Sequence, residues 1–317
     1  MMQNQTETWT NTAEALQLLA RQRKVWPALQ AGCEALSKVK VKLIRIDGLT
    51  VKVQYNPARS VSSCAKTDAQ FLRERPCFLC PAHLPPQQEG LPMGQNYLLL
   101  CNPYPIFPEH FTIASRTHTP QHIYPCFADL LKTARHLSGL SIFYNGPQSG
   151  ASAPDHLHFQ AVTGLYMPID EEAELHKTAI WLEKEEGAIY LLGGYLRNGF
   201  ILESETEQGA CSLFFHLYKT LRAHVEGDTE PRMNIFCRYS ETKGWVVIII
   251  PRKAHRPRQF YATGSEQILV SPGAADMGGV FVTTREEDFQ KITPTLLQDI
   301  YAQLAFGNEL LSVVSDH

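Results

Sequence analysis

Residues 144–160 read YNGPQSGASAPDHLHFQ, a loop of small residues that runs directly into His-Leu-His-Phe-Gln. If the last five residues form a strand, alternate side chains share a face, which puts His156, His158 and Gln160 together. Leu157 and Phe159 then point to a core. The loop before them has two glycines and little side-chain bulk, so backbone N–H groups can approach a phosphate closely. A histidine nucleophile beside a phosphate cradle is what group transfer at phosphorus requires.

The composition bounds the class of protein. The chain has 317 residues, a hydrophobic fraction of 44% and a net charge of −3, which fits an ordinary globule of one large domain or two smaller ones. This charge gives no reason to expect nucleic acid or an anionic membrane as partner. No apolar run approaches the roughly 20 residues of a spanning helix, and segment 1–12 is too polar for a secretory signal. We expect a cytoplasmic protein, and the eight scattered cysteines argue against a disulfide framework.

Periodicity and turn residues predict the elements of secondary structure. In the first half we expect a helix that Pro27 breaks or kinks, a hairpin around Asp47-Gly48, three more strands and one further helix. These are 12–35, 39–46, 49–55, 96–101, 108–114, 127–137 and 141–144. In the second half we expect helices over 170–186, 212–223 and 294–311, and strands over 233–239, 245–250 and 280–283. This order predicts an α+β fold of antiparallel sheets with packed helices.

Two segments of the chain resemble each other. Residues 112–120 and 249–257 each read as a strand end followed by Arg, then His, one residue and Pro. The similarity suggests two related halves with a boundary near Gly164, namely 1–164 and 165–317. The second half has no His-x-His-x-Gln, so only the first would carry a catalytic strand, and the second would contribute to substrate binding.

Two other features suit a site for ions or phosphates. Cys77 and Cys80 form a Cys-x-x-Cys pair, a spacing at which two thiolates can bind one tetrahedral ion, provided that two more ligands come from elsewhere. The alternative is an ordinary pair of reduced cysteines. Arg59 follows a predicted strand, where it could reach a phosphate or remain a solvated loop arginine.

The motifs resemble those of a known superfamily. The segment His156–Gln160 resembles the His-x-His-x-Gln motif of the nucleotidyltransferase branch of the histidine-triad superfamily. That branch includes galactose-1-phosphate uridylyltransferase, the diadenosine tetraphosphate phosphorylases and the GDP-galactose phosphorylases. The loop 144–152 looks like the tetraphosphate phosphorylase loop, and 76–80 looks like the zinc knuckle of the uridylyltransferase. Segments 54–59 and 259–289 are similar to parts of the GDP-galactose phosphorylases.

The resemblance implies roles for individual residues. The second motif histidine, His158, would be the nucleophile, and Gln160 would donate an amide N–H to a phosphate oxygen. The first, His156, would be a zinc ligand with Cys77, Cys80 and His118, in a structural site with no open position. His110 and His83 compete with His118 for one ligand position. The substrate-binding residues would be loop residues and three arginines: Asn145, Gly146, Ser149, Gly150, Ser152, Arg59, Arg116 and Arg252.

The resemblance also implies a reaction. His158 would attack the α-phosphorus of a nucleoside diphosphate sugar or a dinucleoside polyphosphate, and the nucleotidyl-histidine would pass to a phosphate or sugar-phosphate acceptor. Gln160 cannot act as a general acid or base, which favours transfer over hydrolysis. The alternatives are a histidine-triad hydrolase and a non-catalytic nucleotide-binding module. Leu157 stands where the uridylyltransferase has Pro, nearer to the GDP-galactose phosphorylase form, for which zinc is not expected. The family often pairs two halves or two subunits, so a homodimer is one state to test.

Overall fold

The structure, a computed structural model, describes residues 7–60, 69–194, 196–227, 229–307 and 309–310. Its strands are β1 (Lys40–Ile46), β2 (Leu49–Tyr55), β3 (Gly90–Met93), β4 (Tyr97–Cys101), β5 (His110–Ser115), β6 (Leu140–Asn145), β7 (His158–Thr163), β8 (Lys177–Lys184), β9 (Gly187–Leu192), β10 (Gly199–Ser204), β11 (Met233–Ser240), β12 (Gly244–Pro251) and β13 (Val280–Thr283). Its α-helices are α1 (Thr12–Val25), α2 (Pro27–Ser37), α4 (Ala69–Glu74), α5 (Phe127–His136), α6 (Ile169–Leu175), α7 (Glu207–Ala223), α8 (Arg258–Tyr261), α9 (Ala274–Met277), α10 (Glu286–Lys291) and α11 (Pro294–Leu304).

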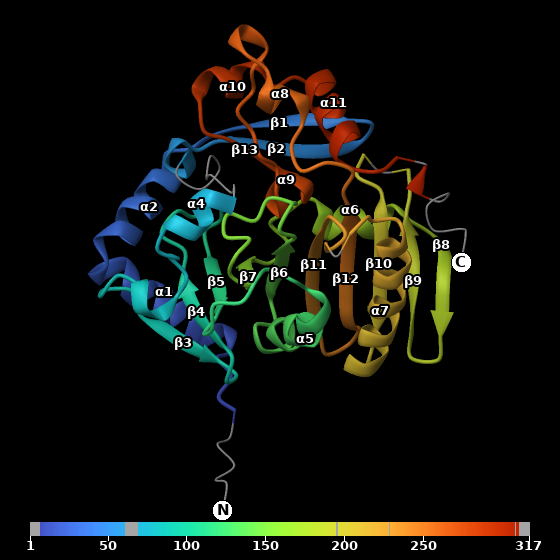
Figure 1. Cartoon of the computed structure of the whole chain (residues 1–317), viewed down its shortest axis with the longest axis horizontal. Coiled ribbons are helices and arrows are strands. Elements are labelled where there is room, and N and C mark those ends of the chain that lie inside the picture. The colour runs from blue at the N-terminus through green and yellow to red at the C-terminus, as the bar shows by residue number, and fades with distance from the viewer. Residues whose placement is uncertain (1–6, 61–68, 195, 228, 308, 311–317) are drawn as a thin grey trace, which may run out of the picture.

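Ten of these strands form one antiparallel sheet in the order β3-β4-β5-β7-β6-β11-β12-β10-β9-β8. A second sheet, in the order β1-β2-β13, lies across the ends of the strands of the large sheet, at the top of Figure 1, with α8, α10 and α11 beside it. In this small sheet β13 runs parallel to β2, with Phe281 opposite Val53. Segments that are more than 200 residues apart in sequence thereby close one end of the molecule.

Local signals explain the first elements. Asn11 caps α1 with a capping box, and Pro27 begins α2, where its missing N–H costs nothing. Trp26 separates the two helices, which confirms the predicted break. In the hairpin of β1 and β2, Asp47 and Gly48 both have positive φ values, 50° and 86°, as a two-residue turn of this kind requires.

Alternation along the strands builds a core on each face of the large sheet. Ile142 of β6 packs in a cluster with α1, α5 and α7, whereas the next residue, Phe143, packs on the opposite face with β2, β13 and α11. Leu157 and Phe159 both belong to the first cluster, as the sequence predicted. The fold is therefore α+β with antiparallel sheets and packed helices, which confirms the predicted class.

The element order repeats within the large sheet. Three strands, a helix and two strands occur once as β3–β7 with α5 and again as β8–β12 with α7, and β6 pairs with β11 where the two sets meet. In this correspondence β12 matches β7. The similarity between 112–120 and 249–257 pairs β12 with β5 instead, so it does not follow the repeat. The division at Gly164 stays a prediction, and the pairing of β13 with β2 crosses it.

One predicted helix is wrong. Residues 170–186 form only the short helix α6, and 177–184 form β8, an edge strand that pairs with β9. The segment is rich in Glu and Lys, which are good helix formers, but pairing with β9 overrides this local preference. The predicted helix over 294–311 ends at Leu304, and its last predicted residue lies outside the described part of the chain. Within that part, no helix is both long enough and apolar enough to cross a bilayer.

Candidate active site

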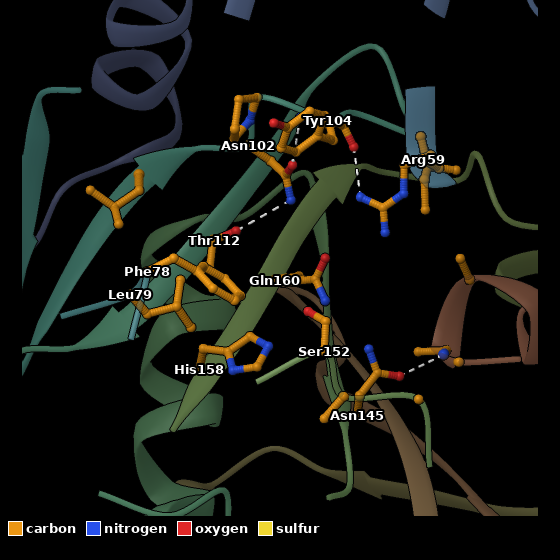
Figure 2. A pocket seen from close by; sticks show the side chains of 18 of the residues that line it. Arg59, Phe78, Leu79, Asn102, Tyr104, Thr112, Asn145, Ser152, His158 and Gln160 are labelled. Carbon is orange, nitrogen blue, oxygen red and sulfur yellow. Dashed lines mark hydrogen bonds between the residues drawn. The ribbon is translucent and has the colours of Figure 1, made fainter. Parts of the chain in front are cut away.

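A cavity of about 450 Å³ opens beside the start of β7 (Figure 2). Four segments far apart in sequence line it: the 145–152 loop after β6, the turn after β4, the Cys77–Cys80 knuckle and residues 271–276 before and within α9. His158 and Gln160 both face it from β7. The strand begins at His158, two residues later than the sequence predicted, and His156 lies in the turn before it.

The imidazole of His158 is fixed in one tautomer. Its Nδ1–H donates to the carbonyl oxygen of His156 at 2.8 Å, so Nε2 carries the lone pair and is the nitrogen left for the cavity. The side chain is buried, and this burial lowers the pKa of His158 to about 4. The imidazole is therefore neutral at neutral pH, as a nucleophile must be.

His110 holds the amide of Gln160. The backbone N–H of Ile106 donates to Nδ1 of His110 at 3.1 Å, and Nε2–H of His110 donates to Oε1 of Gln160 at 2.8 Å. With its oxygen engaged in this way, Gln160 turns its amide nitrogen to the cavity (Figure 2). Burial, assisted by the charge of Arg59, lowers the pKa of His110 to about 3. The sequence suggested His110 only as a rival metal ligand, and this second role was missed.

The small-residue loop divides into two groups. Asn145, Gly150 and Ser152 line the cavity. The Asn145 side-chain oxygen accepts from the backbone N–H of Ala274 at 2.6 Å and from Nδ2 of Asn234 at 2.9 Å, which leaves its amide nitrogen for the cavity.

Gly146 and Ser149 hold the turn together instead. The N–H of Gly146 donates to the carbonyl of Met233, and the N–H of Ser149 donates to the carbonyl of Gly146. Ser149 is fully buried, and its carbonyl accepts from Asn234. Neither backbone N–H is therefore available to a ligand.

The three predicted arginines have different surroundings. Arg59 lines the cavity and donates from Nη1 to the carbonyl of Tyr104 at 2.7 Å, while its buried Nε has no partner among the described residues. Burial lowers the pKa of Arg59 to about 10. Arg252 is buried outside the cavity, where it donates to Asn234 and to three backbone carbonyls. Arg116 is exposed and lies away from the cavity wall.

Several residues of the site were missed from the sequence. Arg256 lines the cavity and donates from Nε to the hydroxyl of Ser271 at 2.9 Å. Asn102 and Thr112 also face it, and Nδ2 of Asn102 donates to the Thr112 hydroxyl at 3.4 Å. Arg256 lies in the segment 249–257, which the sequence singled out only for its similarity to 112–120, and no local pattern shows which of its basic residues reaches the cavity.

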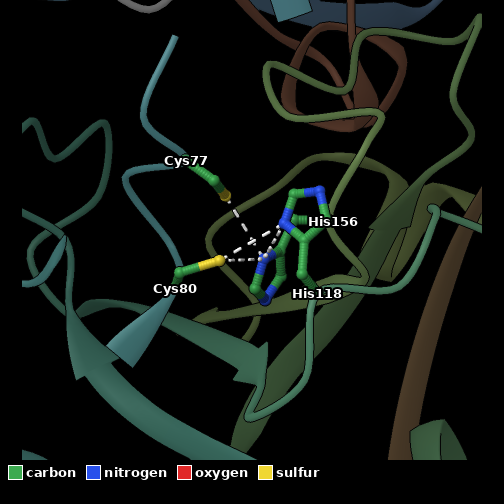
Figure 3. A group of neighbouring side chains, drawn as sticks. All are labelled: Cys77, Cys80, His118 and His156. Carbon is green, nitrogen blue, oxygen red and sulfur yellow. Dashed lines mark hydrogen bonds between the residues drawn. The ribbon is translucent and has the colours of Figure 1, made fainter. Parts of the chain in front are cut away.

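Cys77, Cys80, His118 and His156 converge in one cluster (Figure 3). The sulfur of Cys77 lies 3.3 Å from Nδ1 of His156, the sulfur of Cys80 lies 3.3 Å from Nδ1 of His118, and the two Nδ1 atoms are 3.3 Å apart. A tetrahedral zinc site has edges of roughly 3.3 Å between nitrogens and roughly 3.6 Å between nitrogen and sulfur. The spacing of the four ligand atoms therefore fits a tetrahedral metal ion.

The surroundings of the cluster also suit a metal. Nε2–H of His156 donates to the carbonyl of Ser115 at 2.8 Å, which leaves Nδ1 as the ligand atom. Asp155 lies 3.8 Å from Nε2 of His118 and forms an ion pair with Arg75. Of the two rival ligands, His110 is engaged with Gln160, and His83 bonds through Nδ1 to the carbonyl of Cys77.

Comparisons with known proteins identify the fold. Residues 18–163 match a family described as a domain of unknown function (DUF4922). None of the curated proteins matches the chain. The structure of yeast Ap4A phosphorylase Apa2 superposes with a TM-score of 0.61 at 16% identity, covering 95% of this chain and 96% of that one. Its complex with Ap4A superposes with a TM-score of 0.59 at 14% identity, covering 95% and 99%.

The chain has the fold of yeast Ap4A phosphorylase Apa2. This fold is one of those that the resemblance of the sequence motifs implied. The shared fold extends over nearly the whole of both chains, so the second half and the small sheet belong to the architecture as well.

Proposed function

We propose that this protein is a nucleotidyltransferase that works through a covalent nucleotidyl-histidine on His158. The observation that carries the proposal is the hydrogen bond from Nδ1–H of His158 to the carbonyl of His156, because it leaves a neutral Nε2 beside the cavity. The fold, which this chain shares with an Ap4A phosphorylase, supports the same reaction class.

The reaction has two displacements at one phosphorus. Nε2 of His158 attacks the α-phosphorus of a nucleoside diphosphate sugar or a dinucleoside polyphosphate; the P–N bond forms, and the bond to the bridging oxygen breaks. The distal phosphate part leaves with that oxygen and its electron pair. A phosphate or sugar-phosphate oxygen then attacks the same phosphorus, the P–N bond breaks, and the imidazole is restored. Two steps of this kind give ping-pong kinetics.

Amide groups stabilise the negative charge that develops on the phosphoryl oxygens. The nitrogens of Gln160 and Asn145 face the cavity because their oxygens are engaged by His110 and by Ala274. Fixed donors of this kind need no reorganisation as charge develops on the oxygens. Neither amide can act as a general acid or base, which favours transfer to a phosphate over general-base hydrolysis. Arg59 and Arg256, both on the cavity wall, would hold the distal phosphates.

The cluster of Cys77, Cys80, His118 and His156 would hold a structural zinc ion. Four protein ligands leave no position for water, so the ion would brace the knuckle against the turn before β7 and supply no chemistry. Phe78 and Leu79 lie between the two cysteines and line the cavity. Phe78 is 49% exposed, which leaves one surface of its ring for a nucleobase to stack upon.

The wider organisation is also proposed. The repeat of strands and helices supports two related halves divided near Gly164, with the second contributing residues 271–276 to the site. We also propose that the protein is cytoplasmic, that its substrates are small-molecule nucleotides, and that it can associate into a homodimer.

One experiment tests the proposal. The protein is incubated with α-³²P-labelled nucleotide sugars or Ap4A, quenched in alkali, and examined for an acid-labile, alkali-stable protein adduct. We expect a stoichiometric adduct that transfers its label to added phosphate or sugar phosphate, and no adduct in His158→Asn. Turnover without an adduct would indicate direct displacement by the acceptor, and tight nucleotide binding without turnover would indicate a binding module. Either result overturns the covalent mechanism.

A further inference from the structure

The side chain of Gln121 lies between the ends of β6 and β7. These strands pair from Leu140 opposite Thr163 to Phe143 opposite Gln160. Continued by two residues, the same register would place Asn145 opposite His158, but the ladder stops before that pair. Gln121 occupies the position where the next backbone hydrogen bonds would form, and it is 3% exposed.

The Gln121 amide bonds to both strands. Its oxygen accepts from the backbone N–H of His158 at 2.8 Å. Its nitrogen donates to the carbonyl of His158 at 3.0 Å and to the carbonyl of Asn145 at 2.9 Å. The opposite orientation of the amide would place NH₂ against an N–H, so these three partners fix it. A side-chain amide thus replaces the backbone pairing and holds the two strands apart.

The Gln121 segment is itself held in place. The backbone N–H of Gln121 donates to the carbonyl of Pro154 at 3.1 Å, and that of Leu157 donates to the carbonyl of Thr119 at 2.7 Å. Three residues before Gln121 is His118, and two residues before His158 is His156, both in the Cys/His cluster. The segment that carries Gln121 is therefore bonded to the turn before β7, and both belong to the segments that supply histidines to the cluster.

The two residues that Gln121 joins are the ones that face the reacting phosphorus in the proposed function. Asn145 and His158 line the cavity from opposite sides of the opening between the strands. A shift of about 1 Å in a reacting group can change a rate by about a hundredfold. The spacing of these two residues therefore bears directly on the chemical step.

We infer that Gln121 is a positioning residue that sets the separation of His158 from Asn145 and the orientation of the His158 imidazole. This inference rests on the proposed function. Gln121 acts only through the backbone groups it bonds, and it lies outside the cavity wall. Loss of its two N–H donors leaves two buried carbonyls unpaired, and the strands relax toward each other or apart.

The test compares Gln121→Glu, which keeps the size of the side chain and the acceptor for His158 N–H, with Gln121→Met, which removes all three bonds. The single-turnover rate constant for adduct formation is measured and normalised to the adduct stoichiometry. We expect it to fall at least tenfold in both variants, while the Kd for the nucleotide changes less than threefold. A purely structural role would lower stability and the active fraction but leave the normalised rate constant unchanged.

Gln22→Met is the matched control. Gln22 is also a fully buried glutamine that bridges two backbone groups, since its oxygen accepts from the N–H of Glu89 and its nitrogen donates to the carbonyl of Gln87. It lies on α1, away from β6 and β7. We expect a comparable loss of stability and an unchanged normalised rate constant.

A second readout is independent of activity. In ¹⁵N-histidine-labelled protein, His158, assigned with His158→Asn, should show a single Nδ1–H tautomer in the unsubstituted chain and a mixture of tautomers in the Gln121 variants. In the unsubstituted chain, the side-chain amide protons of Gln121 should exchange slowly with solvent. Unchanged tautomers with unchanged rate constants, or fast exchange of the Gln121 amide, would overturn the inference. If the unsubstituted chain formed no adduct but its His158 tautomer still became mixed in the Gln121 variants, the proposed function would be refuted. The role of Gln121 in orienting His158 would then still hold.

Discussion

His110 donates a hydrogen bond from Nε2 to the side-chain oxygen of Gln160, at 2.8 Å. This hydrogen bond determines which atom of the Gln160 amide faces the cavity, because a glutamine side chain without a partner can present either its oxygen or its nitrogen. The imidazole accepts a backbone N–H at Nδ1 and therefore must donate at Nε2, so the amide nitrogen of Gln160 is the end that remains.

The first prediction concerns this pair. His110→Phe keeps a ring but removes the donor, so Gln160 can turn its oxygen to the phosphate. We expect the rate of adduct formation to fall about tenfold, which corresponds to about 1.4 kcal/mol for one hydrogen bond. His110→Gln restores a donor near the position of Nε2 and should recover part of the rate. Equal rates for His110→Phe and the unsubstituted protein would contradict this role.

The second prediction concerns stability against pH. Burial lowers the pKa of His110 to about 3, below the value of about 6.5 in the unfolded chain. Above pH 6.5 this histidine is neutral in both the folded and the unfolded chain, so burying it requires no loss of a proton. As the pH falls below 6.5, the unfolded chain binds the proton first, and the free energy of unfolding decreases. Between pH 7.5 and 5.0 the unfolded chain gains the proton that folded His110 does not, at a cost of about 2 kcal/mol. The free energy of unfolding, measured with urea at pH 7.5 and at pH 5.0, should therefore decrease by about 2 kcal/mol less in His110→Phe than in the unsubstituted protein.

The third prediction separates the three arginines. Arg59→Gln should raise the KM for a polyphosphate substrate about tenfold or more, because a charged donor is lost from the cavity wall. Arg252→Met should instead cost about 3 kcal/mol or more of stability, because it leaves Asn234 and buried carbonyls unpaired. Arg116→Gln serves as the control and should change neither. Steady-state kinetics and urea unfolding distinguish these outcomes, and a raised KM in Arg116→Gln would contradict the assignment.

The fourth prediction concerns the metal. Purified protein should contain about one zinc ion per chain, and a strong chelator should remove it and lower the melting temperature by about 5 °C or more. Cys80→Ser should lose the ion. His83→Ala should retain it, because His83 bonds to the backbone of Cys77 and not to the cluster. Metal content by mass spectrometry decides the matter, and loss of zinc from His83→Ala with retention in Cys80→Ser would refute the ligand set.

The fifth prediction concerns the contact between the 145–152 loop and the C-terminal segment. Gly150 has a φ of 96°, and a Cβ there would lie 2.3 Å from the Cα of Gly273. Gly264 also has a positive φ, 61°, but open space around it, so Gly264→Ala should cost only about 1–2 kcal/mol of backbone strain. Gly150→Ala should cost clearly more and should also reduce adduct formation. Equal destabilisation of the two variants would show that the contact does not constrain the loop.

Local pattern predicted much of the fold. The hairpin at Asp47-Gly48, the break at Pro27 and the strands around His158 all follow from turn residues and alternation, which act over a few residues. The strand β8 was missed because its Glu- and Lys-rich segment favours a helix locally. Only its partner β9 makes it a strand, and pairing between segments is not encoded in local propensity.

For the site, the sequence by itself determined the residue types: a His-x-His-x-Gln segment, a small-residue loop and a Cys-x-x-Cys pair. Each of these is a short local motif whose residues lie within a few positions of one another. It also indicated the superfamily through those motifs. The tertiary structure decided which residues meet. Arg59 reaches the cavity while Arg116 and Arg252 do not. His110 orients Gln160 from 50 residues away, and Gln121 holds His158 from 37 residues away. Such contacts depend on how the strands of the sheet lie side by side, and this order is set by the packing of the whole chain.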